Sequence, residues 1–315
     1  MEKISELKCA GIVGTGLMGA SLAVLFIGNG IETILLGRSD AGCERGETIV
    51  NSSFESMRKA GLITPKQIET SKRLLTITQS YADMQAVQAV FEAVTERIDI
   101  KYTVYKQLDQ FVPSALLVAS VSSALSAEIL SAGTVHKERL LVAHLWNPPH
   151  LVPGVEIVRS QYTADSTVKT ALDFLTYLGR NVVVLNKDIE GFIGNRIMHA
   201  MYREALYLIE EGIAGAEDID RLIHYSFGQR FSSVGVLEYF DSCGLDLHMD
   251  VENYIFPTLN CAGKPQKIVT DNVKKGNLGM KTGQGLFDWT KKDINDFIYR
   301  KEKPFYKYVN WHFPK

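Results

Sequence analysis

The chain has 315 residues, of which 46% are hydrophobic and 22% charged, and its formal net charge is −2 at pH 7. This composition is typical of a globular protein with one large or two medium domains, and its charge gives no indication of a nucleic-acid or membrane partner. No signal peptide or bilayer-length apolar run is visible, and the four cysteines lack metal-ligand spacing. We therefore expect a cytoplasmic protein without a metal site.

A glycine-rich turn follows the first apolar run of the chain, residues 8–13. The turn has the G-x-G-x-x-G spacing and is followed by an apolar, helix-compatible run. In a dinucleotide site the first glycine permits a sharp turn, the second lets the backbone approach the pyrophosphate, and the third allows close packing of helix on strand. An ordinary tight strand–helix turn is the alternative. The cofactor-binding residues predicted here are Gly14, Gly16, Leu17, Met18 and Gly19.

Short β-branched runs alternate with longer helical stretches from residue 8 to about 185, which is typical of a parallel α/β sheet. A helix is expected over 41–60, and Thr64 is expected to cap the next helix, with Pro65 at its first position. The later strands are expected at 33–36, 74–77, 86–91, 116–119, 140–143, 155–158 and 181–185.

Helical patterns dominate after Asp188. They are expected at 192–211, 216–227, 234–248 and 251–260, and a segment rich in lysine and aromatic residues ends the chain. The predicted fold is a Rossmann-type, mainly parallel sheet domain over 1–187, followed by a smaller all-helical domain over 188–315. The final segment is expected to pack as a strap on its own domain.

The end of the second predicted strand bears on the choice of cofactor. An NAD site of this type places a carboxylate there, which accepts hydrogen bonds from the adenosine ribose, whereas this chain has Gly37. Glycine does not repel a 2′-phosphate, Arg38 could clamp it, and Ser39 could donate a hydrogen bond to it. These residues favour NADP over NAD. In the alternatives, Asp40 takes the acid's role or Arg38 is a solvated surface residue.

Six stretches of the chain together carry a family resemblance. They are GTGLMG from Gly14, FEAVTERIDIK from Phe91, SVSSALS from Ser120, AHLWNPPHLVPGVEIV from Ala143, EGFIGNRIMHAMYREA from Glu190 and KTGQGLFDW from Lys281. In this order they resemble the L-3-hydroxyacyl-CoA dehydrogenase family, including its branch of gulonate dehydrogenase, lambda-crystallin and carnitine dehydrogenase. The resemblance implies an NAD(P)-dependent enzyme that acts on a CH–OH group, and a homodimer formed through the C-terminal domain.

Dehydrogenation of a secondary alcohol needs a hydride acceptor and a base for the hydroxyl proton. Histidine suits the second task because its ordinary pKa lies near neutrality. His144 lies at the carboxyl end of a predicted strand, where open α/β sheets bind ligands, and it matches the family's catalytic histidine. Glu156, on the next predicted strand, could meet the imidazole and fix its tautomer. A histidine with a structural hydrogen bond is the alternative.

The resemblance implies further polar site residues. Ser123 and Asn195 match positions that hydrogen-bond the substrate's oxygen, and the spacing to His144 favours Ser123 over Ser122. For Asn195 the alternative is a role in the turn after Gly191.

Three residues are expected near the cofactor. Glu96 and Lys101 match positions close to its ribose, although an ordinary surface ion pair would have the same spacing. Asn147 is expected to hold the histidine loop or to touch the nicotinamide end.

Features of two branches of the family meet in this chain. Pro148 and Pro149 look more like the branch that acts on small free hydroxy acids, whereas residues 43–75 resemble the segment that holds CoA, with Ser53 and Lys59 where contacts would lie. We expect a 3-hydroxyacyl-CoA dehydrogenase-type reaction. The alternatives are dehydrogenation of a free 3-hydroxy acid such as gulonate or carnitine, and a non-catalytic, crystallin-like dinucleotide-binding protein.

Overall fold

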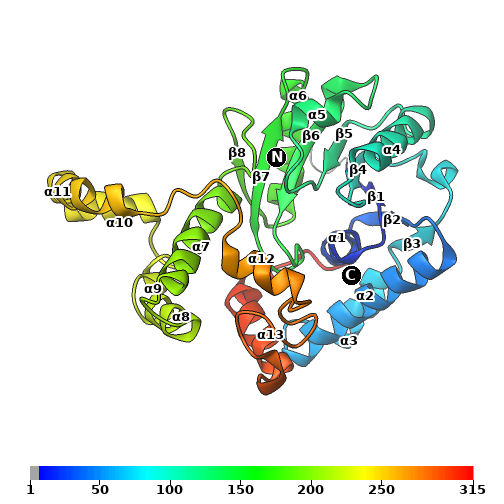
Figure 1. The fold of residues 1–315 in the computed structure, drawn as a ribbon. Helices are drawn as coiled ribbons and strands as arrows, with labels where there is room; N and C mark the ends of the chain where they lie inside the picture. The colour runs from blue at the N-terminus through cyan, green and yellow to red at the C-terminus, as the bar shows by residue number, and fades with distance from the viewer. Residues whose placement is uncertain (1–6, 315) are drawn as a thin grey trace. The chain divides into compact units, whose positions relative to one another are not determined.

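The computed structural model describes residues 7–314 (Figure 1). The chain forms two compact units: the first contains the chain up to Ile193 and the segment from Arg300 onward, and the second is Gly194–Tyr299. Within residues 7–314, no helix combines the length and the hydrophobicity needed to cross a bilayer.

The first unit is built on one eight-stranded sheet with the order β3-β2-β1-β4-β5-β6-β7-β8. Neighbouring strands are parallel except β6 and β7, so the predicted Rossmann-type, mainly parallel sheet is confirmed. Because β7 runs back along β6, it begins at the edge where β6 ends. The strands are β1 (Cys9–Val13), β2 (Glu32–Leu36), β3 (Leu75–Thr78), β4 (Ala89–Glu92), β5 (Leu117–Ser120), β6 (Leu140–Leu145), β7 (Gly154–Arg159) and β8 (Asn181–Val184).

Helices connect these strands and cover the sheet (Figure 1). They are α1 (Leu17–Gly28), α2 (Asp40–Lys59), α3 (Pro65–Lys72), α4 (Ile98–Phe111), α5 (Ala127–Ser131) and α6 (Asp165–Tyr177). The start of α3 is as predicted: Thr64 and Gln67 form a capping box, and Pro65 is the first helical residue, where its missing N–H group is not needed.

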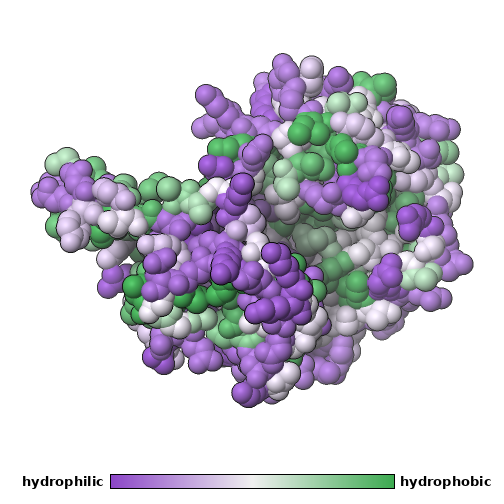
Figure 2. Space-filling view, viewed as in Figure 1, coloured by the Kyte–Doolittle hydropathy of each residue, from purple (hydrophilic) through white to green (hydrophobic). Residues whose placement is uncertain are grey.

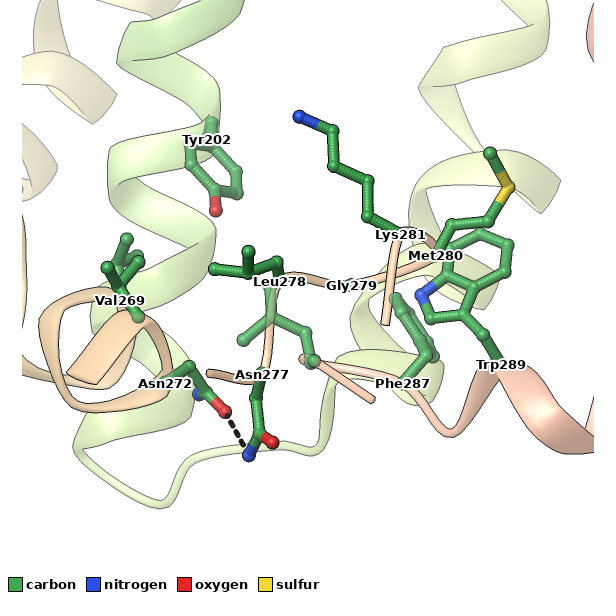
Figure 3. Close-up of a pocket in the computed structure, with 13 residues that line it drawn as sticks. Tyr202, Val269, Asn272, Asn277, Leu278, Gly279, Met280, Lys281, Phe287 and Trp289 are labelled. Carbon is green, nitrogen blue, oxygen red and sulfur yellow. Dashed lines mark hydrogen bonds between the residues drawn. The ribbon is translucent and has the colours of Figure 1, made fainter. Parts of the chain in front are cut away.

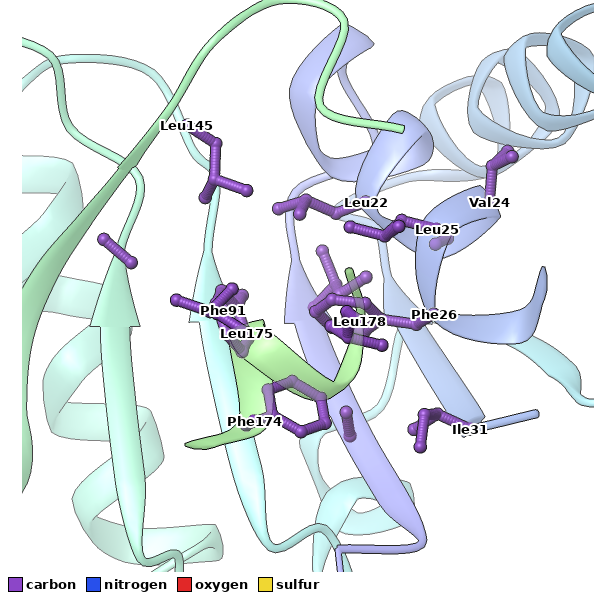
Figure 4. Packing of buried hydrophobic residues seen from close by; sticks show 14 of the residues in the cluster. Leu22, Val24, Leu25, Phe26, Ile31, Phe91, Leu145, Phe174, Leu175 and Leu178 are labelled. Atoms are coloured by element: carbon purple, nitrogen blue, oxygen red, sulfur yellow. The ribbon is translucent and has the colours of Figure 1, made fainter. Parts of the chain in front are cut away.

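Side chains alternate between the two faces of the sheet, so each strand contributes to two cores. On one face, Phe26 of α1 packs against Phe91 of β4 and Phe174 of α6, with ring centroids 5.0 and 5.3 Å apart (Figure 4). On the other face, Val90 and Val142 pack with Leu108 of α4 and their buried neighbours. Removing one of these aromatic side chains should cost about 3–5 kcal/mol of stability.

The second unit is helical, as predicted. Its helices are α7 (Gly194–Glu210), α8 (Ala216–Tyr225), α9 (Phe227–Arg230), α10 (Val236–Cys243), α11 (Leu245–Ile255) and α12 (Lys267–Lys274), and α13 (Ile294–Glu302) spans its end. The prediction of a continuous helix over 234–248 is wrong. Gly244 has φ +96°, which is outside the helical range, so α10 ends there and α11 begins at the next residue.

The C-terminal segment packs on the first unit, and the expectation that it would pack on the helical domain is wrong. The Trp311 ring lies so close to Gly28 of α1 that a Cβ there would come within 2.3 Å of it. The His312 N–H group donates to Asn29 Oδ1 at 3.1 Å, and the His312 ring stacks on Tyr177 of α6. Burial of Trp311 and these contacts outweigh the segment's position in the sequence beside the helical domain.

Candidate active site

The glycine turn between β1 and α1 has the geometry that a dinucleotide requires. Gly14 has φ +115°, and a Cβ there would lie 2.6 Å from the Ala93 carbonyl oxygen. A Cβ on Gly19 would lie 1.8 Å from the Gly14 oxygen, so neither position admits a side chain. Gly16 has no heavy atom within 4 Å of its Cβ position, and no side chain caps α1 there. The backbone is thus open at the positive end of α1, where a pyrophosphate would fit.

The end of β2 is closed to a larger side chain than glycine. A Cβ on Gly37 would lie 2.5 Å from the Cys43 sulfur and 3.0 Å from the Thr15 methyl carbon. A carboxylate at this position would require both neighbours to move. Steric crowding therefore explains why this chain has glycine at the position where NAD sites of this type have a carboxylate.

The residues that follow Gly37 have different roles: one is exposed at the surface and the next caps a helix. Arg38 is exposed, whereas the Ser39 hydroxyl oxygen accepts the Gly42 N–H group at 3.3 Å and caps α2. The Asp40 carboxylate accepts from the Gln79 side chain at 2.6 Å. Arg38 and Asp40 are both exposed, and Arg38 is the cationic residue of this turn.

A buried ionic network joins the ends of β4 and β5. Glu92 and Lys101 are both 0% exposed, and the Lys101 ammonium donates to both Glu92 oxygens, at 2.8 and 3.0 Å. Tyr105 and Ser120 donate to Glu92 as well, at 2.9 and 2.7 Å. Burial, together with the Glu92 charge, raises the pKa of Tyr105 well above its ordinary value. Such a pair is tolerable in the core because its hydrogen-bonding capacity is used.

The structure places Lys101 in this buried network. The sequence suggested a cofactor contact or a surface ion pair, whereas the ammonium lies in the core against Glu92. Glu92 was not predicted from the sequence. The available signal was an acid at the carboxyl end of a predicted strand, nine positions before a lysine.

Glu96 organises the loop that follows β5. One of its oxygens accepts the N–H groups of Ser123 and Ala124, at 3.2 and 3.1 Å, and the Ser122 hydroxyl, while the other lies 3.4 Å from the Lys101 ammonium. Burial opposes ionisation of Glu96, but the Ser122 hydrogen bond and the Lys101 charge outweigh it, and its pKa is lowered. Ser122 is buried and engaged with Glu96, whereas Ser123 is exposed.

His144 and Glu156 face each other across the antiparallel pair of β6 and β7. They are register partners, and His144 Nδ1 lies 2.7 Å from Glu156 Oε2. Both residues are buried, at 3% and 6% exposed. The second carboxylate oxygen accepts the Ile193 N–H group at 2.7 Å, which fixes the carboxylate plane. The strand reversal thus produces the pairing that the spacing of twelve residues suggested.

Two aromatic rings contact the imidazole of His144. The centroid of Trp146 lies 5.5 Å away and that of Phe192 lies 5.3 Å away. Phe192 is fully buried and has φ +52°, a conformation that a non-glycine residue adopts only when its surroundings hold it. Neither aromatic was predicted, although both lie within the motifs that carry His144 and Asn195. Asn147 is exposed on the loop that follows.

The remaining predicted residues lie on other elements. Ser53 and Lys59 are on α2, which packs on α1 and β3, and Lys59 is exposed, 3.9 Å from Glu55. The strand order places β1, β4 and β5 between β2 and β6, so α2 belongs to a different part of the sheet from His144. Asn195 is the second residue of α7, in the second unit.

The second unit contains a hollow of about 480 Å³ beside α7 and α12. Tyr202 faces it from α7, and Leu278, Phe287 and Trp289 line it from the turn that follows α12 (Figure 3). Paired β-bridges from Gln284 close this turn. The lining is mainly hydrophobic and contains no carboxylate or imidazole, so it lacks the acid–base groups of the His144 site. Within residues 7–314, no three His, Cys, Asp or Glu residues are placed to hold a metal ion.

Comparisons with known proteins identify the family of the chain. Residues 9–189 match the 3-hydroxyacyl-CoA dehydrogenase NAD binding domain, and residues 191–289 match the C-terminal domain of the same family. The L-carnitine dehydrogenase of Oceanobacillus iheyensis is 32% identical over 238 residues, which are 76% of each chain.

Solved structures show the same relationship. The 5-formyl-3-hydroxy-2-methylpyridine 4-carboxylic acid 5-dehydrogenase, described as NAD+-dependent, has a TM-score of 0.87 at 27% identity and covers 96% of both chains. The (S)-3-hydroxybutyryl-CoA dehydrogenase of Ralstonia eutropha has a TM-score of 0.76 at 30% identity, over 91% of this chain and 100% of its own. The chain therefore belongs to the 3-hydroxyacyl-CoA dehydrogenase family, whose members are NAD-dependent dehydrogenases, and is a nicotinamide-dependent oxidoreductase that acts on a hydroxyl group.

Proposed function

We propose that this protein interconverts a 3-hydroxyacyl and a 3-oxoacyl compound, with His144 as the general acid–base and Glu156 as its orienting partner. The observation that carries this proposal is the 2.7 Å contact between His144 Nδ1 and Glu156 Oε2, both buried at the carboxyl edge of the sheet. An ionised Glu156 accepts a hydrogen bond only from the Nδ1–H tautomer, so the lone pair of Nε2 remains for the substrate.

The residues divide the work of the reaction. The oxidised nicotinamide cofactor, when bound, supplies the hydride acceptor. His144 Nε2 takes the hydroxyl proton, and Glu156 stabilises the imidazolium that forms, as the Ile193 N–H group holds its second oxygen. We assign Ser123 and Asn195 to hydrogen bonds with the substrate's oxygen. Glu96 holds the loop that carries Ser123 by accepting the Ser123 N–H group. The open backbone at Gly16 receives the phosphates of the cofactor.

A small free 3-hydroxy acid is the second candidate substrate. Two observations favour it: the HLWNPP loop with Pro148 and Pro149, and the higher structural similarity to the pyridine carboxylate dehydrogenase than to the hydroxybutyryl-CoA enzyme, with TM-scores of 0.87 and 0.76. Initial rates of NADH or NADPH oxidation with acetoacetyl-CoA and with acetoacetate distinguish the two candidate substrates. We expect the thioester to have the higher kcat/KM. A higher value for the free acid would support the second candidate, and no turnover of 3-oxo compounds by a cofactor-binding protein would contradict both.

We also propose that the cofactor site prefers NADP within this NAD-dependent family. Gly37 leaves no carboxylate to repel a 2′-phosphate, and Arg38 presents its guanidinium beside it. Arg38→Ala should weaken NADPH binding by about 10- to 100-fold, the equivalent of one charged hydrogen bond of about 1.5–3 kcal/mol, and leave NADH binding unchanged. Calorimetric titration with both nucleotides measures this. An equal loss for both, or tighter binding of NADH by the native chain, would remove the assignment.

The second unit is proposed to form a homodimer. Its surface exposes large hydrophobic side chains on α10 and α11, among them Leu237 and Tyr254, each 84% exposed, and Figure 2 shows hydrophobic residues among polar ones on the visible face. Sedimentation equilibrium of the native chain and of Leu237→Asp should show a dimer that the substitution weakens. A native monomer at micromolar concentration would contradict this proposal.

The half-buried or exposed free cysteines support a cytoplasmic location.

A further inference from the structure

The turn between β6 and β7, residues 146–153, joins the strand that carries His144 to the strand that carries Glu156. One buried guanidinium holds this turn from the side. Arg180 lies just before β8, and because β8 is parallel to β7 and β7 is antiparallel to β6, Arg180 lies at the same edge of the sheet as the end of β6. It is 4% exposed.

The contacts of Arg180 are to backbone carbonyls. Its Nη1 donates to the oxygens of Pro149 and Val152, at 3.1 and 3.2 Å, and its Nε donates to the Leu178 oxygen at 3.1 Å. The guanidinium therefore links two points of the 146–153 turn to Leu178, the C-cap residue of α6. Among residues 7–314, no Asp or Glu lies within ion-pair distance of it.

Burial of the Arg180 guanidinium without a carboxylate partner would be unfavourable if the side chain served only to fill space. Burial lowers the pKa of Arg180 to about 10, and burial together with the Arg180 charge lowers the pKa of His150, within the turn, to about 4. A buried charge without a counter-charge is costly, and an apolar side chain of similar volume would avoid the cost. The cost is understandable if the turn must be held in one conformation.

A second buried arginine provides the internal comparison. Arg139 lies at the opposite end of β6, is 5% exposed, and donates to the oxygens of Val112 and Leu108. It also pairs with Asp109 at 3.2 Å. The two arginines perform the same task on loops at opposite edges, but the loop held by Arg139 is remote from the glycine turn and from His144.

We propose that Arg180 is a positioning residue for the reaction: its guanidinium fixes the 146–153 turn and thereby the geometry of the His144–Glu156 pair. This inference rests on the proposed catalytic function of that pair. It predicts that loss of Arg180 changes the state of the His144 imidazole and the rate of turnover, whereas loss of Arg139 changes stability alone.

The experiment compares full-length Arg180→Gln with Arg139→Gln, each characterised by thermal unfolding, by kcat and KM with acetoacetyl-CoA and NADPH or NADH, and by 15N-histidine NMR. His144→Gln identifies the His144 signals among the seven histidines. Both arginine variants should lose stability. Arg180→Gln alone should lower kcat about tenfold and shift the His144 Nδ1–H signal, since a displacement of about 1 Å can cost on the order of 100-fold.

The outcomes separate this inference from the proposed function. If His144→Gln retains turnover, the catalytic assignment fails, whereas the NMR comparison still tests whether Arg180 positions the imidazole. If His144→Gln is inactive but the two arginine variants have the same kcat and the same His144 signal, the positioning role alone is wrong.

A conservative pair covers the case in which Arg180→Gln does not fold. Lysine keeps the charge but lacks the planar fork that bridges separate carbonyls, so Arg180→Lys should retain part of the function and lower kcat about threefold, with a smaller shift of the same signal. Arg139→Lys should leave both unchanged. Equal values for the two lysine variants would overturn the inference.

Discussion

Two buried pairs of a carboxylate with a basic group lie at the carboxyl edge of the sheet, and they differ in what is left to bond. In the Glu92–Lys101 pair, the carboxylate also accepts from Tyr105 and Ser120, and the ammonium reaches Glu96 as well as Glu92. In the His144–Glu156 pair, the imidazole uses Nδ1, and its Nε2 has no hydrogen-bond partner among residues 7–314. The first pair is closed and the second is open on one side.

This difference indicates that the Glu92–Lys101 pair has a structural role and the His144–Glu156 pair a chemical one. A saturated buried ion pair contributes order, because every donor and acceptor already has a partner in the fold. An imidazole with one nitrogen held and one available can exchange a proton with a ligand. We therefore expect substitutions in the two pairs to have opposite signatures, one in stability and one in turnover.

The largest effect is expected in turnover, at His144. His144→Gln should lower kcat by about 10²- to 10⁴-fold, the usual contribution of a general acid–base, while cofactor affinity changes little because the glycine turn is untouched. Steady-state kinetics and fluorescence titration with NADPH and NADH measure the two quantities. If Lys101→Met lowered kcat as much as His144→Gln at a temperature where both are folded, the two pairs would not differ in function.

The next effect is expected in stability, at Lys101. Lys101→Met leaves the Glu92 carboxylate buried without its cation, so the free energy of unfolding should fall by about 3–5 kcal/mol. Urea unfolding followed by circular dichroism measures it. In a double-mutant cycle, Glu92→Gln should recover part of the loss because it removes the stranded charge. Additive losses would mean that the two side chains do not act as a pair.

The mainly parallel sheet and the positions of its strands could be predicted because local signals and the alternation of strands with helices agree. The glycine turn, the β-branched runs and the cap at Thr64 each specify their own segment, and α3 begins where the cap and Pro65 indicated. The break at Gly244 was missed because the hydrophobic pattern continues through it, whereas the backbone does not.

The contact between His144 and Glu156 could be predicted because the two residues lie on consecutive predicted strands. His144 and Glu156 are joined by one strand reversal, so the spacing carried the information. Glu92, Tyr105 and Arg180 were not identified, because their importance depends on burial and on carbonyls and hydroxyls brought together by the sheet, which no local pattern records.

Another buried base, His150, makes stability depend on pH. It lies in the 146–153 turn beside Arg180, and burial followed by the Arg180 charge lowers its pKa from 6.5 to about 4, so it is neutral in the folded chain at pH 7. Between these values the unfolded chain binds a proton that the folded chain does not, and stability therefore falls as the pH falls through this window. A shift of this size corresponds to about 3 kcal/mol at 1.36 kcal/mol per pKa unit. Urea unfolding of the native chain and of His150→Gln from pH 7 to pH 4 should show curves whose difference increases with acidity; a constant difference would mean that His150 accepts a proton in the fold.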